Sequence, residues 1–271
     1  MPVMNPHPEF FPNAVRSVLA QTLQDLELVI VEDPSRADGK ALIARMEDPR
    51  IRHIQNPLRT SLVDQRNRGL LEARADVVAF LDADDVTLPG RIQKQWDTLC
   101  AHPEIDVLGS QVFIIDDLGQ PVALRAYPLT HDEIVAAMSR YNAIAQPSVM
   151  LRRRVLLEAA GYQYRAFPVA EDYELWSRLV ARGVRFANHP EPLTLYRVHS
   201  AGTKGLLLRH MLRATLDVKE RFWRNRMDAR ARLRFYGERA LLLLPVSFVL
   251  KLFMRTQYTP VHQRSMSRGS F

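Results

Sequence analysis

The fold is decided by the stretch Val77-Val78-Ala79-Phe80-Leu81-Asp82-Ala83-Asp84-Asp85, in which an apolar run leads directly into three carboxylates. The run is too short for a typical helix, and it is apolar on both faces, as is a strand in the middle of a helix-covered sheet. Ligands of such sheets bind beyond the carboxyl ends of the strands. We therefore predict a buried parallel strand that ends in an acidic site.

The spacing of the acids indicates a metal site. Successive side chains of a strand alternate between faces, so Asp82 and Asp84 would point the same way and converge on one hard cation, Mg²⁺ or Mn²⁺. Such a metal can anchor the diphosphate of a substrate. We expect Asp85 to cap the next helix. The alternative is a plain acidic turn after a strand, a frequent origin of isolated D-x-D patterns.

Length and charge indicate one sizeable domain with an appendage. The chain has 271 residues, 47% of them hydrophobic, and a net charge of +7. Residues 204–271 hold 15 Lys and Arg against 4 Asp and Glu, a net charge of +11. Residues 1–203 hold 22 against 26, a net charge of −4. The basic character belongs to the tail, so we expect no nucleic-acid partner for the main region.

The cysteine content and the first residues favour a cytoplasmic protein. Cys100 is the only cysteine, so no intrachain disulfide can form, which is usual in a reducing compartment. The segment Met1–Pro6 has neither the basic nor the apolar region of a secretory signal.

The order of predicted elements is β-α-β-α over the first hundred residues, the signature of a doubly wound parallel sheet. In chain order, the apolar patterns predict a helix near 10–21, a strand at 26–31, a helix at 38–47 and a strand at 51–54. A helix that begins at Ser61, the strand quoted above and a helix after Pro89 follow. The strand at 26–31 also ends in acids, Glu32 and Asp33.

The pattern changes after Asp106. It predicts strands at 107–115, 122–126, 149–151, 184–187 and 193–198. It also predicts three helices: one that begins at Thr130, one that ends at Ala160 and one at 173–182. The composition then shifts, and we place a domain boundary near residue 204. The expected domains are therefore 1–203 and a helical tail at 204–271.

Short motifs in this order carry a resemblance to a known family. They are Ser17–Thr22, Val31–Ser35, Gln65–Gly69, Phe80–Asp85, Ala170–Trp176 and Tyr196–His199. In this order they resemble the inverting glycosyltransferases of family 2, whose catalytic domain has the GT-A, or nucleotide-diphospho-sugar transferase, fold. The resemblance implies an α/β, mostly parallel sheet and metal-dependent transfer of a sugar from a nucleotide-diphosphate sugar to a saccharide or lipid-linked acceptor. It points to cell-surface polysaccharide synthesis.

The sequence departs from the family near its start. Met1–Asn5 resembles the end of the family's first strand, and no apolar run precedes it here. We therefore expect a sheet that lacks one central strand. The empty place would expose backbone groups and apolar faces of two neighbouring strands, at a cost of several kcal/mol out of a typical stability of about 5–15. Pro34 replaces a usual glycine in the Val31–Ser35 motif.

The resemblance implies roles for the donor-side residues. Asp33 would accept hydrogen bonds from the nucleotide base, and Arg66 would approach the nucleotide or its phosphates. Asp82 would contact ribose or metal, and Asp84 the metal. His199 would complete the metal or phosphate site. The plainer alternatives are a turn aspartate at 33, a solvated helix arginine at 66 and a structural histidine at 199.

Inverting transfer also requires a base for the acceptor hydroxyl, separate from the metal-bound pair. Asp172 fits, because the dipole at a helix N-terminus favours its ionised form. The alternative is a simple N-cap aspartate, and both roles are compatible. Glu171, Gln146 and Ser148 are expected on the acceptor side.

The tail is predicted as two helices, at 206–236 and 238–255. The first is dense in arginine: Arg209, Arg213, Arg221, Arg224, Arg226, Arg230, Arg232 and Arg234. The second carries the apolar run Ala240–Leu250, well short of the ~20 residues that span a bilayer. Together they suit an anionic membrane surface, which would place the protein peripherally on the inner face of the plasma membrane. The alternative is helices that pack on the main domain with a solvated basic face.

Two other functions compete with this prediction. A sugar-nucleotide pyrophosphorylase is disfavoured, because the glycine- and lysine-bearing loop for a triphosphate is absent near the first strand. A catalytically silent sugar-nucleotide-binding or scaffolding protein of the same fold remains the alternative, although Asp82, Asp84 and Asp172 are all present.

Overall fold

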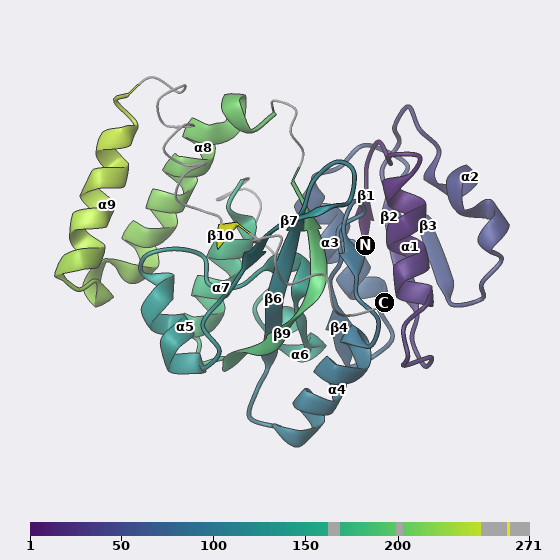
Figure 1. Ribbon diagram of the computed structural model, residues 1–271, viewed down its shortest axis with the longest axis horizontal. Coiled ribbons are helices and arrows are strands. Elements are labelled where there is room, and N and C mark those ends of the chain that lie inside the picture. Colours follow the sequence, from purple (N-terminus) through teal and green to yellow (C-terminus); the bar gives the residue numbers. More distant parts are fainter. Residues whose placement is uncertain (162–168, 199–202, 245–258, 261–271) are drawn as a thin grey trace.

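A computed structural model describes residues 1–161, 169–198, 203–244 and 259–260. Helices α1 (Phe10–Leu19) and α2 (Gly39–Ile43) lie at one end of the molecule with the first three strands, and α8 (Thr203–Val218) and α9 (Ala229–Leu241) lie at the other end (Figure 1). The α/β class predicted from the sequence is confirmed. Within these described ranges, the strands form two sheets rather than one.

The first sheet is parallel throughout. Its strands, in spatial order, are β1 (Pro2–Val3), β2 (Leu28–Glu32) and β3 (Ile51–Gln55). Its helices are α1 (Phe10–Leu19), α2 (Gly39–Ile43), followed by a 3-10 turn (Ala44–Met46), and α3 (Leu62–Glu72). Helix α3 begins after Ser61, as predicted, with a capping box in which Ser61 and Asp64 satisfy each other's backbone N–H groups. Apolar side chains of α1, β2 and α2 form the core here.

The second sheet is mixed. Along its path the order is β10 (Thr259–Pro260), β7 (Pro121–Arg125), β6 (Val107–Ile115), β8 (Met150–Arg152) and β4 (Val77–Ala79). The long β9 (Phe186–Arg197) pairs in parallel with β6, and β5 (Val86–Thr87) pairs with β9. The two strands predicted at 184–187 and 193–198 are thus one continuous strand, and its pairing with β6 shifts in register near Gln111. The helices are α4 (Arg91–Ala101), α5 (His131–Met138), α6 (Arg153–Glu158) and α7 (Glu171–Ala181).

The central strand differs from the prediction. β4 has only three residues, runs antiparallel to its partner β8, and stands last in the order of its sheet. Val77 and Val78 are half-buried and Ala79 is exposed, so the strand is not covered on both faces. The reason is that, among the described residues, no strand lies on the other side of β4.

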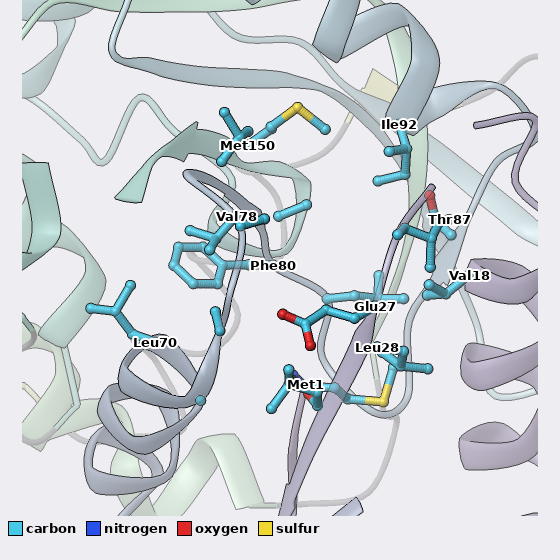
Figure 2. Close-up of a pocket in the computed structure, with 18 of the residues that line it drawn as sticks. Met1, Val18, Glu27, Leu28, Leu70, Val78, Phe80, Thr87, Ile92 and Met150 are labelled. Carbon is cyan, nitrogen blue, oxygen red and sulfur yellow. Dashed lines mark hydrogen bonds between the residues drawn. The ribbon is translucent and has the colours of Figure 1, made fainter. Parts of the chain in front are cut away.

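A cavity of about 740 Å³ occupies that place, between β4 and the first sheet. Figure 2 shows Val78 and Phe80 on one side of it and Val18 and Leu28 on the other. β1, the strand next to it, is two residues long, so the expectation of an incomplete first strand agrees with the structure. The amine of Met1 is buried there and donates to the Val29 carbonyl at 2.8 Å. Its burial lowers the pKa of the amine to about 5.

The tail helices pack on the main region. They are α8 (Thr203–Val218), a π-helical turn (Lys219–Trp223), a 3-10 turn (Arg224–Arg226) and α9 (Ala229–Leu241). Val218, Trp223 and Phe235 belong to the same buried cluster as Trp176 of α7. The Trp223 indole also donates to the Ser177 hydroxyl at 2.8 Å. Within the described ranges, no helix combines the length and apolar character needed to cross a bilayer.

Candidate functional site

The acidic motif forms a turn. Residues 82–85 lie outside β4 and β5, and the Asp85 N–H donates to the Asp82 carbonyl at 3.2 Å. The prediction that Asp82 and Asp84 share one face of a strand is therefore wrong about the backbone. The three carboxyls still influence one another: burial raises the pKa of Asp85, and repulsion from Asp84 and Asp82 raises it further.

Asp85 supports this turn from inside. Its side chain is buried, and one oxygen accepts from the Arg197 N–H at 2.7 Å. The expectation that Asp85 caps the next helix is wrong, since Gly90 precedes α4. Arg197 also donates to the carbonyls of Asp84, at 2.9 Å, and of Asp116, at 2.7 Å. The sequence singled out the motif that contains Arg197 but gave no role to that residue.

Arg66 brings two of the sequence motifs together, the acidic turn and the Glu171–Asp172 pair. It projects from α3, and its side chain is only 5% exposed. One nitrogen donates to Glu171 at 2.8 Å. The other donates to Asp82 and to the Gln146 amide oxygen, both at 3.1 Å. Charge-assisted bonds of this kind are short and directional, so they fix the relative position of the segments that they join. The alternative of a solvated helix arginine is excluded.

The pair Glu171 and Asp172 opens α7, as predicted. The Glu171 side chain is 13% exposed, and burial together with repulsion from Asp172 raises its pKa, against the opposing charge of Arg66. Asp172 accepts from the Asn142 amide at 2.9 Å and from the Tyr173 N–H at 2.7 Å. Burial raises the pKa of Asp172 too, and the charge of Arg66 opposes this.

This environment changes the argument for Asp172 as a base. It is the second residue of α7, and Ala170 occupies the N-cap position. The sequence predicts that the helix N-terminus keeps this carboxyl ionised. Burial instead dominates, and the pKa of the Asp172 carboxyl rises. A carboxylate of raised pKa accepts a proton more readily, provided that it remains ionised at the working pH.

Asp33 lies at the end of β2 and is buried. It accepts from the Asn56 amide and the Thr60 N–H, both at 2.6 Å, and from the Thr60 hydroxyl at 3.0 Å. Burial opposes its ionisation, but these bonds outweigh burial and lower the pKa of Asp33. In the structure Asp33 therefore holds the loop between β3 and α3, and its predicted contact with a nucleotide base stays a prediction.

One predicted residue, Ser148, is not brought to the site, and another lies outside the described residues. Ser148 is fully buried, and its hydroxyl donates to the Ala145 carbonyl at 2.8 Å and accepts from the Ser110 N–H at 3.0 Å. It lies beneath the site and cannot line an acceptor pocket. Gln146, two residues earlier, does reach Arg66. His199 lies outside the described residues.

The acidic turn fits a divalent cation that shares its ligands with a substrate. The part of the chain that the structure describes contains no group of three or more side chains able to hold a metal. Mg²⁺ and similar ions are commonly held by one or two carboxylates, with substrate phosphates completing the coordination. Asp82 and Asp84 match that donor set, and the mutual repulsion of the acids marks the place where a cation is favoured.

Comparison with known proteins identifies the family. The model of glycosyl transferase family 2 matches residues 1–160. The amylovoran biosynthesis glycosyltransferase AmsE of Erwinia amylovora is 30% identical over 195 residues, 71% of this chain and 72% of that protein. The UDP-Glc:alpha-D-GlcNAc-diphosphoundecaprenol beta-1,3-glucosyltransferase WfaP of Escherichia coli is 28% identical over 207 residues, 76% and 78%. An uncharacterized glycosyltransferase of Haemophilus influenzae is 28% identical over 208 residues, 73% of this chain but 64% of that protein.

Solved structures agree on the fold. Mannosyltransferase PcManGT from Pyrobaculum calidifontis, in complex with GDP-Man and Mn²⁺, has a TM-score of 0.63 at 14% identity, over 94% of this chain and 71% of that chain. S. aureus TarS 1-349 in complex with UDP has a TM-score of 0.59 at 17% identity, over 80% and 63%. These likenesses support the GT-A fold. Since the family model covers more than half of its length, the chain belongs to glycosyl transferase family 2.

Proposed function

We propose that the protein transfers a sugar from a nucleoside-diphosphate sugar to a saccharide or lipid-linked acceptor, with inversion and with a divalent metal, in surface polysaccharide synthesis. One observation carries the proposal: Arg66 joins the acidic turn and the Glu171–Asp172 pair in a single site. The names of WfaP and AmsE and the GDP-Man and Mn²⁺ bound by PcManGT support it.

On the donor side, Asp82 and Asp84 would hold Mg²⁺ or Mn²⁺ together with the diphosphate. The metal supplies neutralisation of the charge that develops on the leaving nucleoside diphosphate. Arg66 lies beside Asp82, so its guanidinium is within the same site as that charge. The loop held by Asp33 would flank the nucleotide base.

On the acceptor side, Asp172 would take the hydroxyl proton as the acceptor oxygen forms its bond to the anomeric carbon. The bond from that carbon to the diphosphate breaks, and the diphosphate leaves with the electron pair. Asn142 holds one Asp172 oxygen at 2.9 Å, which orients the carboxylate. A sugar-nucleotide-binding protein without catalysis is the alternative, and it would release no nucleoside diphosphate in the presence of metal.

The tail supports a further part of the proposal, attachment to an anionic membrane. Arginines 209, 213, 221, 224, 226, 230, 232 and 234 are all exposed. On α9, Leu233 is 76% and Tyr236 61% exposed, three residues apart and therefore on one face. Exposed basic and apolar side chains on one helix are what binding at a membrane interface requires.

The first prediction concerns Arg66. Arg66→Met leaves Glu171 buried beside Asp172 without its cation, a kind of change that costs about 3–5 kcal/mol. Because the pKa of Glu171 is already raised by burial, its ionisation opposes folding as pH rises above the ordinary value of 4.5. The loss of stability should therefore be larger at pH 7.5 than at pH 5. Urea unfolding at both pH values measures it, with the exposed Arg45→Met as control. An equal loss at both pH values would contradict this account.

The second prediction concerns the metal. Asp84→Asn removes one charge from the donor set, so Mn²⁺-supported donor binding should weaken at least tenfold, and excess chelator should abolish transfer. Calorimetric donor titration with and without Mn²⁺ measures the first effect. Asp97→Asn, an exposed position on α4, should behave as wild type. Full transfer activity in excess chelator would reject the metal.

The third prediction separates chemistry from binding. Asp172→Asn still accepts from the Tyr173 N–H but cannot take a proton, so kcat should fall about 10²–10⁴-fold. Donor affinity should stay within a few-fold, the pattern of an interaction needed only in the transition state. Transfer kinetics and donor titration measure the two effects, and circular dichroism checks folding. If a folded variant transfers sugar at near the wild-type rate, the base has to be sought at Glu171.

The fourth prediction concerns the tail. Since its helices share the main core, charge substitution is a cleaner test than deletion. Replacing Arg213, Arg230 and Arg232 by Gln should weaken binding to phosphatidylserine vesicles about 100-fold, at ~1 kcal/mol for each charge, and binding of the wild type should fall with salt. Cosedimentation measures both. The same change at Arg36, Arg45 and Arg59, exposed near the first sheet, is the control. Equal effects of the two triple substitutions would refute attachment through the tail.

A further inference from the structure

A buried arginine of α4 lies behind the acidic turn. Arg91 is the first residue of α4, and its side chain is among the largest that are fully buried. Its hydrogen-bond partners are uncharged. Nη2 donates to the Phe80 carbonyl at 3.0 Å and to the Val149 carbonyl at 3.3 Å, and Nε donates to the Gln95 amide oxygen at 2.9 Å. Burial lowers the pKa of Arg91 to about 9, and the charge of Asp85 opposes this, so the guanidinium is charged at neutral pH.

Packing of α4 does not account for a charge in this place. Apolar side chains of similar volume often stabilise a core as well as buried charges do, or better. A guanidinium offers something else, since its rigid fork holds several acceptors at fixed positions relative to one another. The residues whose carbonyls it holds therefore indicate what Arg91 does.

Gln95, one turn further along α4, extends the network. Its side chain is fully buried. The amide nitrogen donates to the Ser148 carbonyl at 2.9 Å and to the Leu108 carbonyl at 3.1 Å, while the amide oxygen accepts from Arg91. Ser148 ends the 3-10 turn Gln146–Ser148, and Leu108 belongs to β6. A buried polar network with all of its members bonded specifies one arrangement of the segments that it joins.

The segments that this network joins are those that meet at the site. Phe80 lies two residues before the acidic turn, in the segment that leads into it from β4. Val149 directly follows the 3-10 turn that carries Gln146. Arg66 joins the same two segments on the side of the site, through Asp82 and Gln146. The acidic turn is thus held from the site by one guanidinium and from the core by another.

We propose that Arg91 and Gln95 are positioning residues for the acidic turn. From within the core they fix the Phe80 carbonyl relative to the turn Gln146–Ser148, which holds the carboxylates of the acidic turn in the arrangement that a divalent cation requires. Their effect on metal binding rests on the proposed function, and their effect on the turn itself does not. A cation binds the fraction of molecules whose turn is correctly placed, so loosening the turn weakens binding in proportion to that fraction.

Two substitutions and a matched control test the proposal. Arg91→Lys keeps the charge but replaces the fork by a single ammonium, which lacks the geometry to serve two carbonyls and an amide at once. Gln95→Met keeps the approximate volume and removes the amide. The control is Leu99→Ala, at a buried position of the same helix, which weakens the packing of α4 without removing a polar side chain.

The first measurement is amide hydrogen exchange at Phe80 and Asp85, whose N–H groups bond to the carbonyls of Val149 and Asp82. The proteins are compared at urea concentrations that give them the same free energy of unfolding, so that differences report local opening. Exchange at both amides should be at least tenfold faster in Arg91→Lys and Gln95→Met than in the Leu99→Ala control. Equal exchange in all three would overturn the proposal. If Arg91→Lys does not fold, Gln95→Met decides the result.

The second measurement is calorimetric titration with Mn²⁺ in the presence of UDP, and separately of GDP. The dissociation constant of Mn²⁺ should rise at least fivefold in Arg91→Lys and Gln95→Met and stay within twofold in Leu99→Ala, with the number of bound ions unchanged. A merely structural role would instead lower the number of binding-competent molecules and leave the dissociation constant as it is, which would overturn the proposal. If the wild type takes up no Mn²⁺ with either nucleotide, the proposed function fails, and exchange at Phe80 and Asp85 decides whether the turn is positioned from α4.

Discussion

The arrangement of the site depends on the buried guanidinium of Arg66. A cation that is 5% exposed is costly unless it is paired, and its partners come from the acidic turn, from α7 and from the 3-10 turn at Gln146–Ser148. Without this cation, the repulsion between Glu171 and Asp172, which already raises the pKa of Glu171, would have less to oppose it.

Arg197 and Asp85 hold the backbone of the acidic turn, residues 82–85, in place. Arg197 bonds to the backbone carbonyl of Asp84, and Asp85 accepts the Arg197 N–H, so the backbone of the turn is tied to the end of β9. Neither contact involves the side chain of Asp82 or Asp84, so other partners position those two side chains. One arginine thus sets the side-chain chemistry of the turn and the other sets its backbone.

The sequence predicted what is local and missed what is not. The capping boxes at Ser61 and Thr130 placed two helix starts, because the bonds that they make lie within one turn. The ion pair from Arg66 to Glu171 joins residues 105 positions apart, and no spacing in the sequence encodes it. The burial of Ser148 and the turn at Asp82 likewise depend on packing against β6 and on a short β4, which periodicity cannot reveal.

The cavity and the site share residues. Arg66 and Gln146 line the cavity as well as the site, and Gln65 beside Arg66 donates to the Val3 carbonyl of β1 at 3.3 Å. β4 ends three residues before Asp82, so a single short segment joins its edge to the acidic turn. The Met1 amine already lies in the field of Asp82 and Arg66. β4 is therefore the element that connects the packing of the sheets with the turn that carries Asp82 and Asp84.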